Sequence, residues 1–360
     1  MTPNNSPKSP SSSDRPFRVG LTDDSIWERI MNCPSSRAML ESAAGIEIGR
    51  CPVDVDPIGP DVLNRFDAIA AGGSYFTDQT LAGADRCTLI VRYGAGFDRV
   101  DLDACTEAGV IVATTPLGVR RSVAGAAMTL ILALSIQLFQ KSKLVATHRW
   151  DRVVDPNFVG VGLTRKTLGF VGFGSIGKEL HHLIRPFQMR HLVYDPYVDE
   201  QFIVSQGAEQ VQLDTLLAES DFVAVVCNLT DETHHLLSTD QFALMKRSAY
   251  VVNVARGPII DQGALTKALA DGVVAGAGLD ALDPEPMEPG DPLLEMPNVI
   301  LTPHGLAYTD EMIRLCSEGC VQAALAVRQG HHPESVINRA VLGTGQLEEK
   351  LEAYRRWYGA

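Results

Sequence analysis

The stretch that decides the fold is LGFVGFGSIG, residues 168–177. Its first four residues are apolar without alternation, as in a strand that is covered on both faces, and a helix-patterned run, KELHHLI, follows the stretch. Between strand and helix lie the glycines of a G-x-G-x-x-G spacing, Gly172, Gly174 and Gly177. In a dinucleotide-binding turn, the first glycine makes the tight turn, the second admits the pyrophosphate, and the third lets the helix pack against the sheet. The stretch therefore predicts a nucleotide site, with the phosphates at the start of the helix, Ser175 and Ile176.

The acid at the end of the next apolar run indicates which dinucleotide is bound. The run HLVYD ends in Asp195, 18 residues after Gly177. A carboxylate at this place can accept hydrogen bonds from both ribose hydroxyls and repels a 2′-phosphate, so it favours NAD over NADP. The alternative is a glycine turn that serves packing alone, with Asp195 as a solvated strand end.

Outward from this turn, short β-rich apolar runs alternate with helix-patterned stretches. The runs before the turn are 17–22, 45–50, 68–72, 89–94 and 110–115, and those from the turn onward are 168–174, 191–195, 222–227, 250–255, 276–282 and 299–303. Runs such as FVAVVC and YVVNVA lack alternation, which is typical of buried parallel strands. Repeated strand–helix units form doubly wound sheets. We therefore expect an α/β fold with two doubly wound parallel-sheet units.

The segments around these units are of three kinds. Residues 118–167 are mostly helix-patterned, and their apolar run, 123–139, reaches only the lower edge of a membrane span, so we interpret it as a buried helix. The pattern of residues 309–329 predicts another long helix. For residues 346–358, a terminal helix and an irregular segment both stay open. Residues 1–16, MTPNNSPKSPSSSDRP, have almost no apolar content and predict a disordered tail that is not a secretory signal.

The composition of the 360-residue chain narrows the classes of function. A hydrophobic share of 45% allows large cores, and the length suits two domains of ordinary size. The formal net charge of −13 argues against a nucleic-acid partner, because phosphate-backbone binding needs a basic face. Seven cysteines without a C-x-x-C pair indicate reduced thiols and a cytoplasmic protein. We predict no metal site: members of each histidine pair are adjacent and point apart, and Cys316 and Cys320 have no histidine nearby in sequence.

Three ionisable residues follow strands of the second series, at the end of the sheet where ligands bind. Arg256 follows YVVNVA, Glu285 follows GAGLDALDP, and His304 follows VILTP. A guanidinium can clamp a carboxylate through two parallel hydrogen bonds, and histidine is the natural proton donor near neutral pH. Each residue also has a simpler interpretation: Arg256 as a solvated loop cation, Glu285 as a surface turn acid, and His304 as a structural loop histidine. Sequence spacing does not show that Glu285 touches His304.

Together these motifs resemble the D-isomer-specific 2-hydroxyacid dehydrogenase family. The matching stretches stand in order over roughly residues 89–312: RYGAGFDRVDLDACTEAGVIV, TLGFVGFGSIGKEL, NVARGPIIDQGALTKAL, AGAGLDALDPEP and NVILTPHGLAYTDE. The resemblance implies a Rossmann NAD-binding domain, residues 118–305, inserted into a flavodoxin-like substrate domain, residues 17–117 and 306–340. Residues 341–360 would be a C-terminal extension, and the active site would lie in the cleft between the domains.

The resemblance also implies roles for the candidate residues. Arg256 would bind and orient a 2-oxo acid, His304 would be the acid/base, and Glu285 would hold and charge His304. Backbone amides around Ala95 and Gly96 would take the substrate carboxylate.

Further implied contacts concern the cofactor and a second copy of the chain. Cofactor contacts fall on Cys227, Ala255 and Asp280, the last near the nicotinamide. The apolar helix after Ser122 would lie in a homodimer interface.

The activity that the resemblance implies is hydride transfer between NAD(H) and a small D-2-hydroxy acid or 2-oxo acid. Within that class, glyoxylate or hydroxypyruvate reduction and phosphoglycerate oxidation stay open. A different class also stays open, an NAD(H)-binding, corepressor-like module that recruits proteins with little or no catalysis.

Two local features each have two interpretations, one of which concerns the identity of the substrate. Arg120 and Arg121 precede Val123-Ala124-Gly125, where the family commonly reads V-A-E. One explanation is a substrate with a second anionic group that one of the arginines meets, and the alternative is surface or dimer-contact charge. Ser74 and Tyr75 also have two interpretations: they line the expected active-site cleft, or they belong to a structural turn.

Overall fold

A computed structural model describes residues 15–51 and 57–358, and these residues form two compact units. Unit 1 comprises the described residues up to Val119 and those from Thr309 onward, and unit 2 comprises Arg120–Tyr308. Most of the predicted disordered tail, residues 1–14, lies outside the described residues. The prediction is wrong for its last two residues, because Arg15 pairs with Asp67 and the Pro16 carbonyl accepts a hydrogen bond from Arg86.

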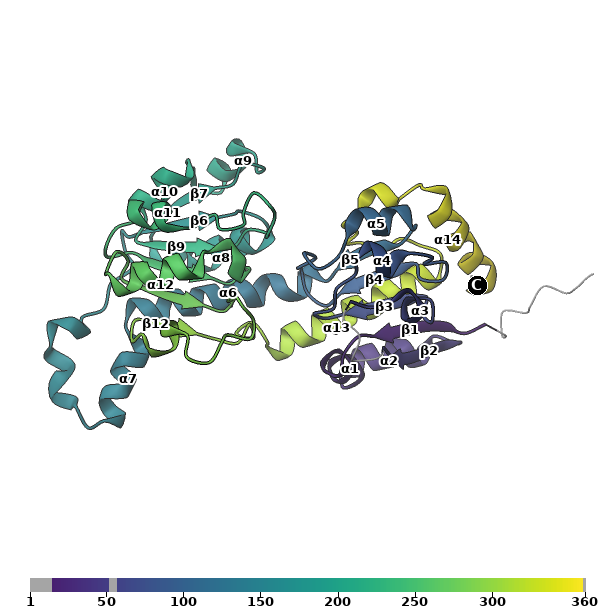
Figure 1. Cartoon of the computed structure of the whole chain (residues 1–360), viewed down its shortest axis with the longest axis horizontal. Coiled ribbons are helices and arrows are strands. Elements are labelled where there is room, and N and C mark those ends of the chain that lie inside the picture. Colours follow the sequence, from purple (N-terminus) through teal and green to yellow (C-terminus); the bar gives the residue numbers. More distant parts are fainter. Residues whose placement is uncertain (1–14, 52–56, 359–360) are drawn as a thin grey trace, which may run out of the picture. The chain divides into compact units, whose positions relative to one another are not determined.

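Unit 1 is built on a five-stranded parallel sheet in the order β2-β1-β3-β4-β5, which is the flavodoxin-like order (Figure 1). The strands are β1 (Phe17–Leu21), β2 (Ile46–Arg50), β3 (Ala68–Ala71), β4 (Leu89–Arg92) and β5 (Ile111–Thr114). The helices are α1 (Asp24–Met31), α2 (Pro34–Ser42), α3 (Pro60–Leu63), α4 (Asp78–Leu81), α5 (Leu102–Glu107), α13 (Asp310–Arg328), η6 (Arg339–Val341) and α14 (Gly345–Tyr358).

Unit 2 is built on a seven-stranded parallel sheet in the order β12-β11-β10-β9-β6-β7-β8, a Rossmann order with one added strand. The strands are β6 (Thr167–Val171), β7 (Arg190–Tyr194), β8 (Glu209–Gln210), β9 (Phe222–Val225), β10 (Tyr250–Asn253), β11 (Gly276–Leu279) and β12 (Val299–Leu301). The helices are α7 (Leu138–Ala146), η1 (Trp150–Val154), η2 (Pro156–Phe158), α8 (Ser175–Ile184), η3 (Arg185–Phe187), α9 (Glu200–Ser205), α10 (Leu213–Glu219), α11 (Thr239–Leu244), η4 (Gly257–Ile259), α12 (Gln262–Ala270) and η5 (Pro292–Glu295). The predicted class, two doubly wound parallel sheets, is confirmed.

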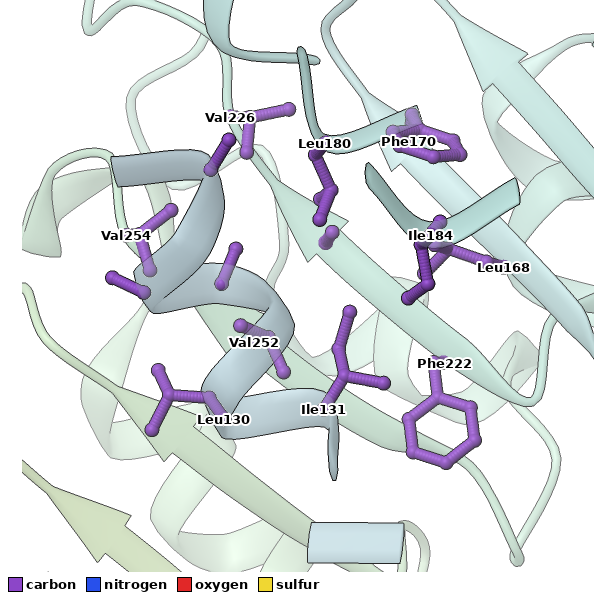
Figure 2. Close-up of a cluster of buried hydrophobic side chains, with 14 of the residues drawn as sticks. Leu130, Ile131, Leu168, Phe170, Leu180, Ile184, Phe222, Val226, Val252 and Val254 are labelled. Carbon is purple, nitrogen blue, oxygen red and sulfur yellow. The ribbon is translucent and has the colours of Figure 1, made fainter. Parts of the chain in front are cut away.

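Helix α6 (Pro116–Ser135) is the apolar helix that follows β5. By length and composition it is the one helix among the described residues that could cross a membrane, and half of its most apolar window is buried. Leu130 and Ile131 pack in the unit 2 core with side chains from β6, α8, β9 and β10, as Figure 2 shows. A Cβ on Gly278 of β11 would lie 3.1 Å from the side chains of Leu130 and Leu134, so this helix lies directly on the sheet. The burial explains the apolar composition of this face.

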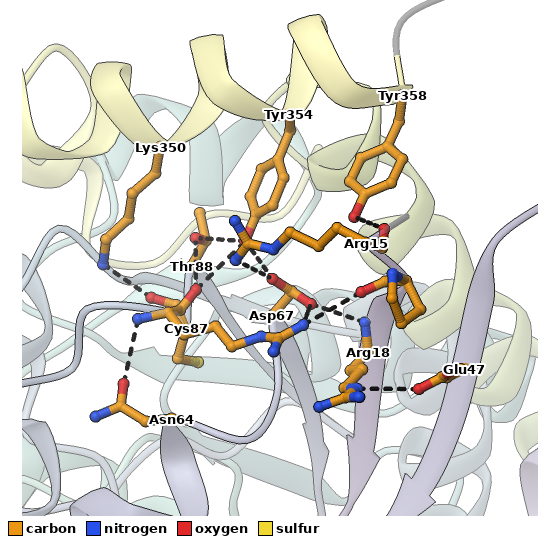
Figure 3. Close-up of polar contacts among 12 residues, drawn as sticks. Arg15, Arg18, Glu47, Asn64, Asp67, Cys87, Thr88, Lys350, Tyr354 and Tyr358 are labelled. Atoms are coloured by element: carbon orange, nitrogen blue, oxygen red, sulfur yellow. Dashed lines mark hydrogen bonds and ion pairs between the residues drawn. The ribbon is translucent and has the colours of Figure 1, made fainter. Parts of the chain in front are cut away.

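Helix α14 is held on unit 1 by a buried carboxylate and a half-buried ammonium group (Figure 3). Asp67 is fully buried and accepts hydrogen bonds from Tyr354, from Arg86 and from the Arg18 amide, at 3.1, 2.7 and 2.8 Å. Lys350 donates to the carbonyl groups of three residues, Ala84, Cys87 and Ala108. The last helix is therefore an integral part of unit 1.

Two buried histidines form a dyad beneath the glycine turn of unit 2. His181 Nε2 lies 3.0 Å from the Gln206 carbonyl oxygen, which can only accept, so His181 Nδ1 must be an acceptor. His191 Nδ1, 2.8 Å away, is then the donor. The remaining nitrogen, His191 Nε2, is buried and has no partner within the described part of the chain. The His181 ring also packs on Phe173 of the glycine turn, at a centroid distance of 5.7 Å.

Replacing His191 with phenylalanine should flatten the acid dependence of stability. Burial, together with His181 and Arg185, lowers the pKa of His191 to about 4. The unfolded chain, with a histidine pKa near 6.5, binds this proton more readily, so stability falls as the pH drops from about 6.5 toward 4. We expect the melting temperature to fall less between pH 7.5 and pH 5 in His191→Phe than in the wild type. An equal fall in both proteins would contradict the assignment.

Candidate active site

The glycine turn after β6 is held by close packing at two of its three glycines. Gly172 has a φ of +97°, which L side chains rarely adopt, and a Cβ on it would lie 2.8 Å from the backbone of Cys227. A Cβ on Gly177 would lie 2.7 Å from the carbonyl oxygen of Gly172. A Cβ on Gly174, by contrast, would meet no atom within 4 Å. Packing therefore requires the first and third glycines, whereas the second leaves the start of α8 accessible to a ligand.

Asp195 ties this turn to the end of β7. Its Oδ2 accepts a hydrogen bond from the amide of Phe173 at 2.7 Å, and its Oδ1 accepts from the amides of Tyr197 and Val198 at 2.9 and 3.2 Å. A carboxylate has about four acceptor positions, so these three bonds leave capacity for a ribose hydroxyl. Asp195 is half-buried beside the turn, where a bound ribose would meet it.

The surroundings of the turn fit a dinucleotide. Gly174 is the N-cap of α8, so the amides of Ser175 and Ile176 have no acceptor within the helix. The turn lies between β6 and β9, where the strand order reverses and doubly wound sheets bind their ligands. Cys227 follows β9, and burial raises the pKa of its thiol to about 11, so it stays neutral near pH 7. The predicted cofactor residues other than Ala255 and Asp280 thus lie around one turn.

Asn253, the last residue of β10, shapes the turn that carries Arg256. Its Oδ1 accepts a hydrogen bond from the Ala255 amide at 3.0 Å, and its Nδ2 donates to the Arg256 carbonyl oxygen at 2.9 Å. Arg256 Nη1 in turn donates to the Ala255 carbonyl oxygen at 2.8 Å. Asn253 is buried, whereas Ala255 and Arg256 are half-buried. The turn therefore presents Arg256 at the carboxyl end of the sheet on a buried support.

The residue after Arg256 packs directly on the segment that leads to Glu285. A Cβ on Gly257 would lie 1.9 Å from the carbonyl oxygen of Leu282, so only glycine permits this approach. The Leu282 amide donates to Glu285 Oε1 at 3.0 Å. The segments that carry Arg256 and Glu285 are therefore positioned by the same backbone contact.

The structure brings His304 and Glu285 together, which sequence spacing could not show. His304 Nδ1 lies 2.9 Å from Glu285 Oε2 and 3.0 Å from Oε1. The side chains are 42% and 31% exposed, so a ligand can reach the pair. Since Nδ1 faces the carboxylate it is the donor, and Nε2 is left to exchange a proton with a ligand.

Asp280 fixes the loop on which His304 lies. Its Oδ1 accepts from the Thr302 hydroxyl at 2.7 Å and from the amides of Gly305 and Leu306 at 3.0 and 3.1 Å. His304 has a φ of +50°, in the left-handed region that non-glycine residues seldom occupy. The Asp280 hydrogen bonds flank this unfavourable conformation on both sides and hold it.

The charges of the site favour an ionised Glu285. Burial opposes ionisation of this carboxyl, but hydrogen bonds from His304 and the Leu282 amide, together with the positive charges of His304 and Arg256, lower its pKa below the ordinary value. The carboxylate is therefore charged near neutral pH, where it faces Nδ1 of His304.

The predicted substrate-carboxylate residues, Ala95 and Gly96, lie in unit 1 in the loop after β4. Buried Arg92 organises this loop, because its Nε donates to the Gly96 carbonyl oxygen at 3.2 Å and its Nη1 to the Ser74 carbonyl oxygen at 3.1 Å. Arg92 thus joins the loops after β3 and β4.

Arg120 and Arg121, the two cations before the apolar part of α6, share one acid in the structure. Both pair with Glu179 of α8: Arg120 Nε lies 3.5 Å from Glu179 Oε2, and Arg121 Nη1 bonds Oε1. The single carboxylate of Glu179 therefore offsets one of their two positive charges within unit 2.

The two cysteines of the α13 helix have a core role. Cys316 and Cys320 are buried on α13 in unit 1. No group of three histidine, cysteine, aspartate or glutamate residues that could hold a metal occurs among residues 15–51 and 57–358.

The residues that support the site were not apparent from the sequence. Asn253, Arg92 and the loop-holding role of Asp280 were not predicted. The available signal was a polar residue at or just after the carboxyl end of a buried strand, in the runs YVVN, LIVR and GAGLD. The sequence does not reveal which loop each side chain reaches.

Comparison with known proteins finds relatives that match most of the chain. Residues 128–305 match the family model of the D-isomer specific 2-hydroxyacid dehydrogenase, NAD binding domain. The chain is 35% identical over 286 residues to the glyoxylate reductase of Korarchaeum cryptofilum, covering 78% of this chain and 86% of that one. It is also 35% identical to the D-3-phosphoglycerate dehydrogenase of Methanocaldococcus jannaschii, covering 86% of this chain and 59% of the relative. The crystal structure of D-lactate dehydrogenase from Aquifex aeolicus, complexed with NAD and lactic acid, superposes with a TM-score of 0.76 at 29% identity, covering 87% and 96% of the two chains.

Proposed function

The chain belongs to the D-isomer-specific 2-hydroxyacid dehydrogenase family and has NAD-dependent 2-hydroxyacid dehydrogenase activity; from this premise we propose that His304, paired with Glu285, is its acid/base and that Arg256 orients the substrate. The proposed substrates are a small D-2-hydroxy acid and the corresponding 2-oxo acid. The observation that carries the proposal is the pair of 2.9 and 3.0 Å contacts between His304 Nδ1 and the Glu285 carboxylate.

The proposed proton transfer follows from this pair. Bound NADH supplies the hydride for the carbonyl carbon of a 2-oxo acid. His304 gives the proton on Nε2 to the carbonyl oxygen, and in the oxidation direction it takes the hydroxyl proton back. Glu285 keeps Nδ1 protonated and stabilises the charged ring, because its own pKa is lowered and it stays ionised.

Substrate orientation is assigned to two groups. The Arg256 guanidinium can hold the 2-oxo acid through paired hydrogen bonds. Backbone amides at Ala95 and Gly96 in unit 1 would take the carboxylate. For the cofactor, Asp195 supports NAD rather than NADP, because a carboxylate repels a 2′-phosphate.

A panel assay tests the proposal against its alternative. Purified protein is incubated with NADH or NADPH and with glyoxylate, hydroxypyruvate, pyruvate and larger 2-oxo acids, and the absorbance of the reduced cofactor is followed. Turnover with NADH on at least one acid, exceeding that with NADPH, supports the enzyme. Tight NADH binding without turnover of any acid would favour the corepressor-like module instead.

We also propose a cytoplasmic location for the protein. The seven free cysteines support this location, because thiols stay reduced in the cytoplasm.

We also expect a homodimer, formed through the segment from the end of α6 to η2. This segment extends from the unit 2 sheet in Figure 1 and carries a series of exposed apolar side chains, Ile136, Leu138, Phe139, Val145, Trp150, Val153, Val154 and Val159. Exposed apolar side chains that gather in one segment mark an interaction site, so a second copy is the proposed cover.

Light scattering after size exclusion should give twice the chain mass of 38.9 kDa. A Phe139→Glu, Val154→Glu double variant should shift the protein toward the monomer, because two charges would be buried in the interface. Val204→Glu on α9, a residue exposed to the same degree as Phe139, is the control and should stay dimeric. A monomeric wild type, or a double variant that remains dimeric, would contradict this interface.

A further inference from the structure

Arg99 is an arginine of unit 1 whose guanidinium contacts a backbone carbonyl group and an aromatic ring. Its Nη1 donates to the Gly73 carbonyl oxygen at 2.7 Å, and its Cζ lies 4.9 Å from the centroid of the Tyr75 ring. Tyr75 is 44% exposed. Within the part of the chain that the structure describes, no carboxylate forms an ion pair with Arg99. This distinguishes it from Arg120 and Arg121, which share Glu179.

The position of Arg99 is fixed by the framework that also holds the Ala95–Gly96 loop. The Phe76 amide donates to the Arg99 carbonyl oxygen at 2.9 Å, which joins the loops after β3 and β4. Arg92 joins the same loops through the Ser74 and Gly96 carbonyl groups. A Cβ on Gly73 would lie 3.3 Å from Arg99 Nη1, so the guanidinium lies directly over the backbone next to Ser74. The cation and the Gly96 loop therefore belong to one hydrogen-bonded cluster at the carboxyl end of the unit 1 sheet.

We propose that Arg99, supported by Tyr75, binds a second carboxylate on the substrate, so that the preferred substrates are 2-oxo dicarboxylic acids. The inference rests on the proposed function, because it concerns the far end of the same substrate. One hydrogen bond occupies one of the five guanidinium donors, and the others remain able to form paired bonds to a carboxylate. The ring beneath the cation orients it at little entropic cost. A single guanidinium matches a carboxylate of charge −1 better than a phosphate of charge near −2.

The test compares acids of equal length that differ only in the second carboxylate. These are 2-oxoglutarate against 2-oxovalerate and oxaloacetate against 2-oxobutyrate, with NADH. In at least one of the two pairs, the wild type should show a kcat/KM for the dicarboxylate that is at least about tenfold higher than for the monocarboxylate. This is the gain expected for a charge-assisted hydrogen bond. Arg99→Gln should remove this preference and leave the monocarboxylate value within about threefold. Arg99→Lys, which keeps the charge, should restore part of it.

Arg65→Gln is the matched control, because Arg65 also lies over an aromatic ring of unit 1, at 5.9 Å from the centroid of Phe66. It should keep the wild-type preference, and NADH binding should be unchanged in all variants. Three outcomes would overturn the inference while the proposed function stands. The wild type could have equal kcat/KM for both acids of each pair, or Arg99→Gln could lower kcat/KM equally for both. The third is a higher kcat/KM of the wild type for 3-phosphohydroxypyruvate than for the dicarboxylates. No turnover of any 2-oxo acid would instead reject the proposed function.

Discussion

His304→Ala is expected to lower kcat by about two to four powers of ten, which is the usual contribution of a positioned general acid. The affinity for NADH should change little, because no cofactor contact is assigned to this side chain. Steady-state rates with the best 2-oxo acid give kcat, and titration of NADH fluorescence gives the dissociation constant.

The control for this variant is His332→Ala. His332 is also paired with a glutamate, Glu348, with 3.7 Å between His332 Nε2 and Glu348 Oε1, but it belongs to unit 1 and to no proposed site. It should retain wild-type turnover. Near-normal turnover in His304→Ala would reject the acid/base assignment.

Arg256→Gln is expected to lower kcat/KM by about thirtyfold to a thousandfold. Removing one partner of a hydrogen-bonded charge pair costs roughly 2–4 kcal/mol, and each 1.36 kcal/mol is a factor of ten. Most of the loss should appear in KM, since Arg256 is proposed to bind the acid. Arg256→Lys should recover only part of it, because an ammonium group cannot form the paired hydrogen bonds of a guanidinium.

Arg247→Gln serves as the control for Arg256. Arg247 is an exposed arginine of unit 2 outside the proposed site, and its loss should leave kcat/KM unchanged. If Arg256→Gln kept the wild-type KM for every accepted acid, the orienting role would be wrong.

The strands could be predicted because most of the buried parallel strands are short apolar runs. All eleven predicted strands are present, for example Thr167–Val171, which contains the run LGFV, and Phe222–Val225, which lies within FVAVVC. The twelfth, β8, has only two residues, Glu209 and Gln210, and neither is apolar, so no run marks it. The predicted runs also extend past the carboxyl ends of several strands, because apolar residues such as Val254 stay buried after the ladder ends.

The ionisable residues of the site could be predicted from their positions after strands, but their contacts could not. Asp280 reaches Leu306 across 26 residues, and Gly257 approaches Leu282 across 25, and such pairs leave no periodic signal in the sequence. The left-handed conformation of His304 was equally invisible, because it is imposed by the loop and not by the residue type. The partners of Arg120, Arg121 and Arg99 also depend on which helices and loops the fold brings together.

A crystal structure with NADH and oxamate, an unreactive analogue of a 2-oxo acid, tests the central claim most directly. The account predicts that His304 Nε2 lies within about 2.6–3.2 Å of the oxygen that stands for the substrate carbonyl, with Nδ1 still on Glu285 and the Arg256 guanidinium on the analogue. An imidazole ring turned away from the analogue, or separated from Glu285 when the analogue is bound, would contradict it.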